Sequence, residues 1–202
     1  MLTIFVGTSA QLNAGVEAEL AVYRHRVFVE QLGWELPSGQ SGLERDQFDG
    51  PETLYVVAKD SEGSVCGCAR LLSTEQAYLL NSVFPDLMDG QPLPNSPAVW
   101  ELSRYTTQPL TGEPLSREQQ KERFAALLKS VVEAALERGA KRLITFSYLG
   151  VERLARNFGL HIHRAGAPRI IDGKPVLAFW IELDEQTRTA LGITEHAVVR
   201  MH

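Results

Sequence analysis

The spacing of apolar residues near the start of the chain predicts a long amphipathic helix over residues 14–31. Its apolar positions recur every three or four residues, at Val16, Leu20, Tyr23 and Val27. Asn13 stands where an N-cap side chain is expected. Arg24 and Phe28 are four residues apart, so they lie one above the other on a face beside the apolar stripe.

A second long helix is predicted over residues 116–138. Ser116 and Gln119 have the spacing of a capping box at its start, and Gly139 suits the position after its end. Its inward positions are Phe124, Leu127, Leu128, Val131 and Ala135. Two shorter helices are predicted over residues 79–84 and 151–159.

Runs of β-branched and aromatic residues predict strands between these helices. Residues 53–60 and 65–73 flank a Ser-Glu-Gly-Ser turn and form a predicted hairpin. The other predicted strands cover residues 4–7, 98–107, 142–148, 160–166 and 175–183. This order predicts an α/β sandwich, with a mixed and mostly antiparallel sheet flanked by helices, in a single domain over residues 1–202.

Composition is that of a soluble globular protein. Of the 202 residues, 44% are hydrophobic and 22% are charged, and no apolar run has the length of a membrane span. The N-terminus lacks the positive and apolar regions of a secretory signal. Cys66 and Cys68 form neither a disulfide framework nor a complete zinc site. We therefore expect reduced core cysteines and a cytoplasmic location.

The net charge of −5 argues against a nucleic-acid-binding protein. The charge is unevenly distributed, because residues 1–63 hold ten acidic and four basic side chains, whereas residues 138–174 hold two acidic and eight basic ones. A basic region on an acidic protein attracts an acidic partner, but the same charges also suit a solvated surface. Both interpretations stay open on charge alone.

The predicted strand at residues 98–107 carries polar groups where a buried strand normally carries apolar ones. Successive residues of a strand point to opposite faces, so Glu101 and Arg104 could not share a pocket on a regular strand. We predict a β-bulge or splay near Ser103, since bulges redirect side chains next to active sites. A buried carboxylate without partners is costly, so Glu101 must be paired, hydrated or catalytic.

The polar loop at residues 35–52 holds two carboxylates, Asp46 and Asp49. They could bind a metal ion, but the loop has no EF-hand spacing and no companion histidine. A buried polar network is the alternative, because three arginines lie in otherwise apolar elements. Its predicted members are Arg24, Arg70 and Arg104 with Asp46, Asp49 and Glu101. Such a network serves structure or function, and residue types alone do not choose between them.

Motifs for several other chemistries are absent from the sequence. The chain has no G-x-S-x-G, P-loop or G-x-G-x-x-G pattern. His161 and His163 share a strand face without a third ligand, so we interpret them as ordinary strand residues and predict no metal site.

Taken in order, several separated residues resemble the acyl-homoserine-lactone synthases of the LuxI type. The pattern is Arg24-x3-Phe28-x5-Trp34-x11-Asp46-x2-Asp49, followed by Arg70, Phe84 and Glu101-x2-Arg104. The resemblance implies a three-layer fold related to the N-acetyltransferase (GNAT) superfamily. It implies two substrates, S-adenosylmethionine and an acyl group on acyl carrier protein. The products are an N-acyl-homoserine lactone, which is a quorum-sensing signal, and methylthioadenosine. No cofactor is implied, because S-adenosylmethionine is itself a substrate.

The resemblance also assigns roles to residues. Glu101 is expected to act as the base that deprotonates the substrate amine, through a water molecule. The S-adenosylmethionine pocket is expected to comprise Arg24, Phe28, Trp34, Asp46, Asp49, Arg70, Phe84 and Arg104. The aromatic wall formed by Phe28 and Trp34 suits a sulfonium or an adenine.

The acyl chain is expected to run between the sheet and the helix at residues 116–138. Candidate lining residues are Leu102, Ser103, Thr145, Phe146, Val151 and Leu154. In this family a threonine at the position of Thr145 often accompanies 3-oxo chains, and Phe146 favours a chain of medium length. The basic region gains an acidic partner in acyl carrier protein, with candidate contacts Arg138, Lys141, Arg142, Arg153 and Arg156.

Two alternatives remain beside this hypothesis. One is a CoA-dependent N-acyltransferase of the same fold. Such enzymes normally have a Gly-rich Q/R-x-x-G-x-G/A turn that binds pyrophosphate, and the segment at residues 106–116 lacks it. The other is a binding module without catalytic activity, which would have no reason to keep costly buried charges.

Overall fold

The computed structural model describes residues 2–34, 42–111 and 114–194, and the start of the predicted polar loop, residues 35–41, lies outside them. The chain divides into two compact units. The first comprises residues 1–70 and 104–130, and the second comprises residues 71–103 and 131–202. The described strands form a mixed eight-stranded sheet. The predicted α/β class is therefore confirmed, whereas a single domain over residues 1–202 stays a prediction.

The first unit is built on strands β1 (Thr3–Thr8), β2 (Leu54–Lys59) and β3 (Val65–Ser73), the last of which ends in the second unit. β1 and β2 pair antiparallel, and the β2–β3 turn is closed where the Asp60 amide donates to the Ser64 carbonyl at 3.0 Å. Both the strand and the hairpin predictions are confirmed.

Helix α1 (Ala14–Arg24) continues without a break into a π-helical segment, His25–Gln31. Asn13 caps α1, because its side-chain oxygen accepts a hydrogen bond from the Val16 amide at 2.9 Å. The extent predicted from the apolar spacing is correct, but the last turns are wider than an α-helix. Single π-helical turns are frequent at functional sites, and this one carries Phe28.

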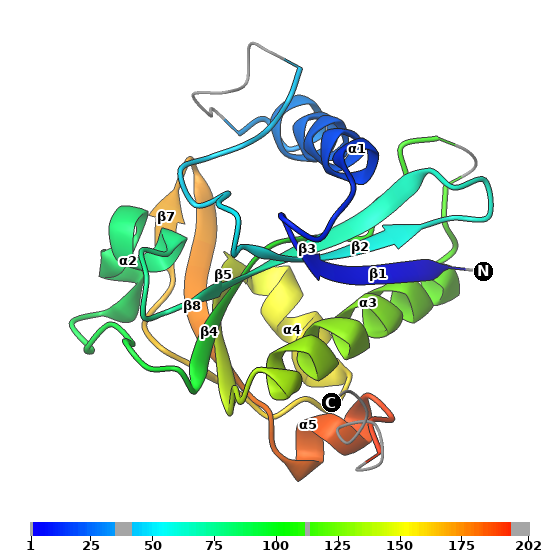
Figure 1. Cartoon of the computed structure of the whole chain (residues 1–202). Helices are drawn as coiled ribbons and strands as arrows, with labels where there is room; N and C mark the ends of the chain where they lie inside the picture. The colour runs from blue at the N-terminus through cyan, green and yellow to red at the C-terminus, as the bar shows by residue number, and fades with distance from the viewer. Residues whose placement is uncertain (1, 35–41, 112–113, 195–202) are drawn as a thin grey trace. The chain divides into compact units, whose positions relative to one another are not determined.

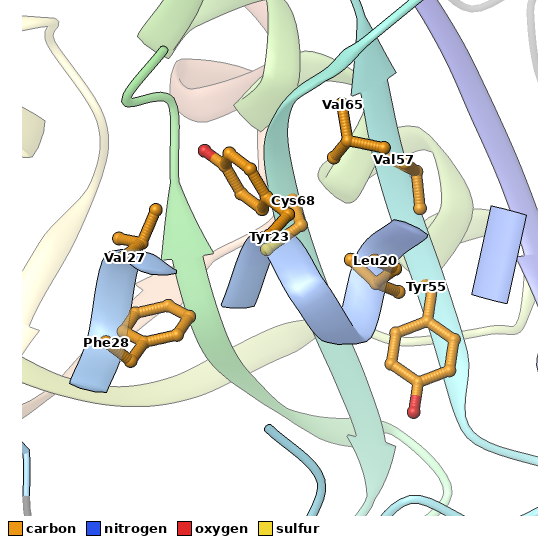
Figure 2. Close-up of a cluster of buried hydrophobic side chains, with 8 residues drawn as sticks. All are labelled: Leu20, Tyr23, Val27, Phe28, Tyr55, Val57, Val65 and Cys68. Atoms are coloured by element: carbon orange, nitrogen blue, oxygen red, sulfur yellow. The ribbon is translucent and has the colours of Figure 1, made fainter. Parts of the chain in front are cut away.

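Helix α1 and the π-helical segment bury their apolar stripe against β2 and β3 (Figures 1 and 2). The cluster comprises Leu20, Tyr23, Val27, Phe28, Tyr55, Val57, Val65 and Cys68. Cys66 and Cys68 are both free and buried, as predicted. Burial raises the pKa of the Cys68 thiol to about 12, so this cysteine behaves as a core residue rather than as a nucleophile.

Helix α3 (Arg117–Glu137) starts in the first unit and confirms the predicted capping box. The Gln119 amide donates to Ser116 Oγ at 3.2 Å, and the Ser116 amide donates to Gln119 Oε1 at 2.9 Å. Gly139 follows the helix with a φ of 78°, a left-handed conformation that glycine adopts without steric cost. The predicted inward residues of α3 are all buried.

The second unit contains the remaining strands. β4 (Val99–Thr106) pairs parallel with β5 (Arg142–Tyr148), while β8 (Lys174–Glu182) pairs antiparallel with β5, β6 (Ile162–Arg164) and β7 (Arg169–Ile171). Its helices are α2 (Leu79–Val83), a 3-10 turn at Pro85–Met88, α4 (Leu149–Asn157) and α5 (Glu185–Ala190). α5 was not predicted; Asp184 caps it by accepting from the Thr187 amide at 3.1 Å. None of the described helices has the length and apolar character needed to cross a bilayer.

Strand β4 is distorted where the sequence predicts it. Its parallel pairing with β5 runs from Val99 to Leu102 and stops there. Two residues later, Arg104 has a φ of 53°. A left-handed backbone costs a non-glycine residue about 1–2 kcal/mol, so the surrounding contacts must hold it.

Candidate active site

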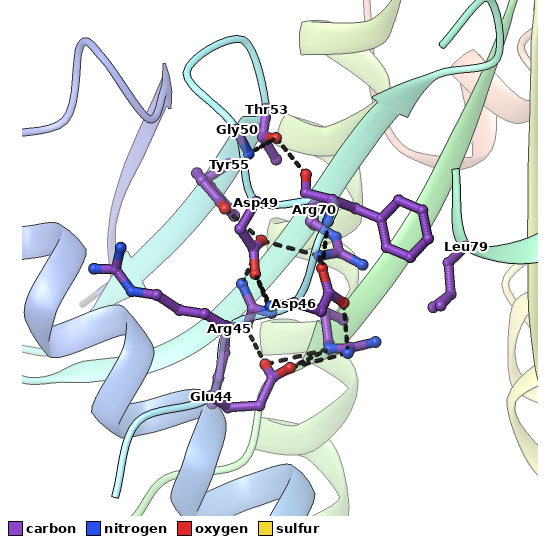
Figure 3. Close-up of polar contacts among 12 residues, drawn as sticks. Glu44, Arg45, Asp46, Asp49, Gly50, Thr53, Tyr55, Arg70 and Leu79 are labelled. Atoms are coloured by element: carbon purple, nitrogen blue, oxygen red, sulfur yellow. Dashed lines mark hydrogen bonds and ion pairs between the residues drawn. The ribbon is translucent and has the colours of Figure 1, made fainter. Parts of the chain in front are cut away.

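Arg24, the last residue of α1, is the first of three buried arginines that meet the acidic loop before β2. Figure 3 shows Asp46 and Asp49 of this loop beside Arg70. Nη1 and Nη2 of Arg24 donate to the two carboxylate oxygens of Asp49 at 2.9 and 3.0 Å. Its Nε donates to Glu44. A guanidinium and a carboxylate paired through two parallel hydrogen bonds have a fixed mutual orientation, so the loop is held firmly to α1.

The other two arginines come from strands β3 and β4 and use the same acids. Nη1 of Arg70 donates to Asp46 at 2.6 Å and to Asp49 at 2.9 Å. Nη2 of Arg104 donates to Glu44 and to Asp46, both at 2.9 Å. Three guanidinium groups therefore share three carboxylates, and the charges within this ionic network balance.

Glu44 is a member of the network that the sequence did not predict, whereas the place of Glu101 in it stays a prediction. Glu44 has no solvent-exposed surface and links Arg24 to Arg104. Burial by itself would raise the pKa of Glu44, but the two arginines outweigh burial and hold that pKa below its usual range. Loop residues carry no periodicity from which burial can be inferred. The sequence offered one signal for a further acid in this loop: Asp46 and Asp49 neutralise only two of the three arginine charges.

Asp49 is the most highly coordinated acid of the network. Besides Arg24 and Arg70, it accepts from the Tyr55 hydroxyl at 2.6 Å and from the Asp46 amide at 2.8 Å. Burial opposes ionisation, but the neighbouring arginines prevail and hold the pKa of Asp49 far below its usual range. Tyr55 was not predicted to belong to the site. Burial, and then the charge of Asp49, raise the pKa of its hydroxyl, which remains a donor.

An aromatic pair borders the ionic network. Phe28 and Trp34 are stacked with ring centroids 4.7 Å apart, as the predicted aromatic wall requires. The Arg104 guanidinium carbon lies 5.6 Å from the Phe28 centroid and 5.3 Å from that of Trp34. The pair therefore already accommodates a delocalised cation, which shows that it suits positively charged groups.

Glu101 lies in the second unit, and its carboxylate is fully buried. Oε1 accepts from the Leu79 amide at 3.2 Å, and Oε2 accepts from the Leu80 amide at 2.6 Å. The Leu80 carbonyl in turn accepts from the Phe84 amide at 3.1 Å. Glu101 thus anchors α2 to β4. A catalytic role for Glu101 would have to be carried out by a buried carboxylate that already accepts from two backbone amides.

Phe84 and the predicted acyl-pocket residues also lie in the second unit. Phe84 packs against Phe146 with centroids 5.0 Å apart. Thr145 and Phe146 are adjacent in β5 and point to opposite faces of the strand, so they do not share one face; their place in the acyl pocket stays a prediction.

Helix α4 lies on the Thr145 face. The register places Thr145 and Arg164 opposite the same β8 residue, and Arg164 binds Glu152 of α4 with contacts of 2.9 and 2.8 Å. Val151 and Leu154 of α4 are half-buried, whereas Leu102, Ser103 and Thr145 are buried.

The five predicted carrier-protein contacts are all in the second unit, but three of them already have partners within the chain. Arg142 binds Glu182 at 3.3 Å and lies over the Trp180 ring, and Arg156 binds Glu152 at 3.1 Å. Arg138 donates to the Ala134 carbonyl at 3.1 Å. Lys141 and Arg153 are exposed.

His163 of β6 and His161, which directly precedes that strand, have acidic partners. His161 contacts Asp184 at 2.6 Å, and His163 contacts Glu182 at 2.7 Å. Within the described ranges, no three His, Cys, Asp or Glu side chains are grouped so as to hold a metal ion. The interpretation as strand residues holds for His163 and not for His161.

Comparison with known proteins places this geometry in a family. The family model described as autoinducer synthase matches residues 9–191. An acyl-homoserine-lactone synthase of Ralstonia solanacearum is 48% identical over 191 residues, covering 94% of this chain and 93% of that protein. A crystal structure of TofI in a ternary complex with an inhibitor and MTA is 44% identical, with a TM-score of 0.85. The match covers 96% of this chain and 99% of TofI.

A more distant structure bears on the fold alone. A putative N-acetyltransferase from Lactobacillus plantarum has a TM-score of 0.59 at 20% identity, covering 91% of this chain and 99% of that one. The similarity agrees with the predicted GNAT-like architecture.

Proposed function

The chain belongs to the autoinducer synthase family, and we propose that it makes an N-acyl-homoserine lactone from S-adenosylmethionine and an acyl group on acyl carrier protein. Methylthioadenosine is the second product. The enzyme class is acyltransferase. The observation that carries the assignment is the convergence of three buried arginines and three acids beside a stacked aromatic pair, built almost entirely from the family's pattern residues.

The first unit supplies the features that S-adenosylmethionine needs. The stacked Phe28–Trp34 pair offers a face to the sulfonium or the adenine. The balanced ionic network holds the loop that borders this pair. Asp46 and Asp49 act indirectly, since their oxygens are engaged by arginines. Arg104 is the residue that connects the network to the aromatic pair.

The reaction requires two bond-forming steps. The substrate amine loses a proton and attacks the thioester carbonyl, so a C–N bond forms as the C–S bond to the carrier breaks. Glu101 is proposed to take that proton through a water molecule. A backbone amide of the distorted β4 segment is proposed to stabilise the oxyanion. The substrate carboxylate then attacks the carbon next to sulfur and releases methylthioadenosine, a step that depends chiefly on positioning.

The carrier is proposed to be acyl carrier protein rather than CoA. The segment after β4 lacks the Gly-rich turn that binds the pyrophosphate of CoA. Lys141 and Arg153 are exposed basic groups on the second unit and suit an acidic carrier protein. We further propose a cytoplasmic location, on the basis of two reduced, buried cysteines, and a reaction without a cofactor. A CoA-dependent N-acyltransferase is the alternative.

The test is incubation of the purified protein with S-adenosylmethionine and octanoyl-carrier protein or octanoyl-CoA. We expect methylthioadenosine release and a lactone detectable by mass spectrometry, with the carrier-protein substrate preferred. Release of neither product from any acyl donor would rule out the proposed function. A strong preference for octanoyl-CoA would instead support the alternative.

The role of Glu101 is tested by Glu101→Gln. A positioned general base contributes about 10²–10⁴-fold, so we expect turnover to fall by a factor in that range. Glu137→Gln changes an exposed acid of the same type and should leave turnover unchanged. Circular dichroism and thermal melting check that the variant remains folded. Full activity in a folded Glu101→Gln protein would exclude the proposed role.

A further inference from the structure

The backbone of Arg104 is held in an uncommon conformation. Its φ of 53° lies in the left-handed region, which residues with a Cβ rarely adopt. At the far end of the residue, the guanidinium binds Glu44 and Asp46 and contacts the aromatic pair. The direction in which a side chain leaves the strand is set by the backbone dihedrals. The left-handed conformation must therefore be kept if the guanidinium is to reach all of these partners.

The thiol of Cys68 reaches this backbone from β3, the neighbouring strand in the sheet. Sγ of Cys68 donates a hydrogen bond to the Arg104 carbonyl oxygen at 3.2 Å. Cys68 is only 1% exposed, and both residues belong to the first unit. Burial raises the pKa of the thiol to about 12, so at neutral pH the sulfur keeps its proton and can donate it.

A glycine next to Cys68 allows the two backbones to come close. A Cβ at Gly67 would lie 3.2 Å from the Thr106 carbonyl oxygen and 3.3 Å from Cβ of Ala58. Glycine permits such a close approach, because it has no side chain to place there. β3 therefore contacts the distorted end of β4 at two points, through the Cys68 thiol at Arg104 and through the Gly67 backbone at Thr106.

We propose that Cys68 is a positioning residue for S-adenosylmethionine, because its thiol keeps Arg104 in the left-handed conformation that directs the guanidinium to the acids and the aromatic pair. The inference rests on the proposed function, in which Arg104 belongs to the S-adenosylmethionine pocket. Without the thiol, Arg104 populates commoner backbone conformations, and only the remaining fraction of the protein binds the substrate. The apparent affinity falls by that fraction. The bound complex still has Arg104 in place, so kcat is unchanged.

The test measures methylthioadenosine release over a range of S-adenosylmethionine concentrations with saturating octanoyl-carrier protein, and the Kd of S-adenosylmethionine by calorimetry. We expect Cys68→Ala to raise both KM and Kd by about two- to fivefold, the size of one hydrogen bond of modest net strength, with kcat unchanged. Cys68→Ser keeps a donor at this position and should return KM and Kd to the wild-type values. Should Cys68→Ala fail to fold, Cys68→Val, which nearly fills the volume and has no donor, takes its place with the same expectations.

Cys66→Ala is the matched control. Cys66 is also a free, buried cysteine of β3, two positions away and therefore on the same face of the strand. Its thiol interacts with Arg123 of α3. The replacement removes the same atom from the same strand, so it should lower the melting temperature much as Cys68→Ala does. It should leave KM and Kd unchanged, which separates positioning from a loss of core packing.

Three outcomes would overturn the inference. They are wild-type KM and Kd in folded Cys68→Ala, an equal rise in both alanine variants, and values that stay raised in Cys68→Ser. Each of these leaves the proposed function standing, because methylthioadenosine is still released. Absence of release from the wild-type protein would instead remove the proposed function.

Discussion

Glu44 is the residue whose replacement most directly tests the ionic network. The perturbation is Glu44→Gln, which keeps the shape of the side chain and removes its charge. Glu44 accepts from Nε of Arg24 and from Nε and Nη2 of Arg104, and none of its surface reaches solvent. After the change, three buried guanidinium groups face two carboxylates, and an amide NH₂ group points at an arginine donor.

The expected loss can be set from the structure. Removing one partner of a buried ion pair costs about 3–5 kcal/mol, because the remaining charge is left uncompensated. Two arginines lose an anionic partner here, but the terms are not additive because the groups share one network. We expect the free energy of unfolding to fall by about 3–5 kcal/mol, a large part of the 5–15 kcal/mol typical of folded domains.

The assay is urea unfolding followed by circular dichroism, on wild type and variant, at several pH values. The pKa of Glu44 is lower in the folded state than in the unfolded state, so its stabilising contribution is present above the unfolded pKa of about 4.3. That contribution is lost as pH falls through the folded pKa. The difference between wild type and variant should therefore be full at pH 7 and should shrink under acid conditions.

Glu62→Gln is the control for charge removal, since Glu62 is an exposed residue of the β2–β3 turn. Its effect should stay within about 0.5 kcal/mol. A loss below about 1 kcal/mol in Glu44→Gln, or a difference that does not depend on pH, would refute the view that Glu44 balances buried arginines.

Three further changes test other contacts. Tyr55→Phe removes the hydroxyl that donates to Asp49 at 2.6 Å. We expect the free energy of unfolding in urea to fall by about 1.5–3 kcal/mol and the KM for S-adenosylmethionine to rise. Unchanged values of both quantities would count against a role for Tyr55. Gly166→Ala places a Cβ in steric clash with the Leu87 carbonyl oxygen, so the backbone must shift and the melting temperature should drop by several degrees. A melt identical to wild type would contradict this close approach. Arg104→Lys keeps the charge but loses the planar group that contacts Glu44, Asp46 and the aromatic pair, so turnover should fall more than tenfold; near wild-type turnover would show that charge alone suffices.

Local patterns in the chain accounted for most of the secondary structure. The apolar spacing, Asn13 and the Ser116 capping box fixed both long helices, because helix ends depend on residues within a few positions of one another. The polar content of residues 98–107 predicted the distortion of β4, which appears at Arg104. α5 was missed, and the π-helical continuation of α1 left no signal in the apolar spacing.

The sequence predicted the site less completely than the secondary structure, because the site joins residues that lie far apart along the chain. The pattern residues were identified by family resemblance, and the structure joins most of those in the first unit into one network. The membership of Glu44 depends on how a loop without periodicity folds onto α1, β3 and β4. The participation of Tyr55 has the same origin, since its ring was predictable as a strand residue but its hydroxyl contact was not.

Residue order alone therefore determined the class of fold, the helix ends, the free buried cysteines and most of the residue types that meet in the ionic network and the aromatic pair. Only the tertiary structure decided which carboxylate meets which guanidinium, and which backbone carbonyl accepts from the Cys68 thiol. The physical reason is that helix caps and periodicity act over a few residues. A buried hydrogen bond such as that between Cys68 and Arg104 joins groups 36 positions apart, and it exists only after the backbone between them has folded.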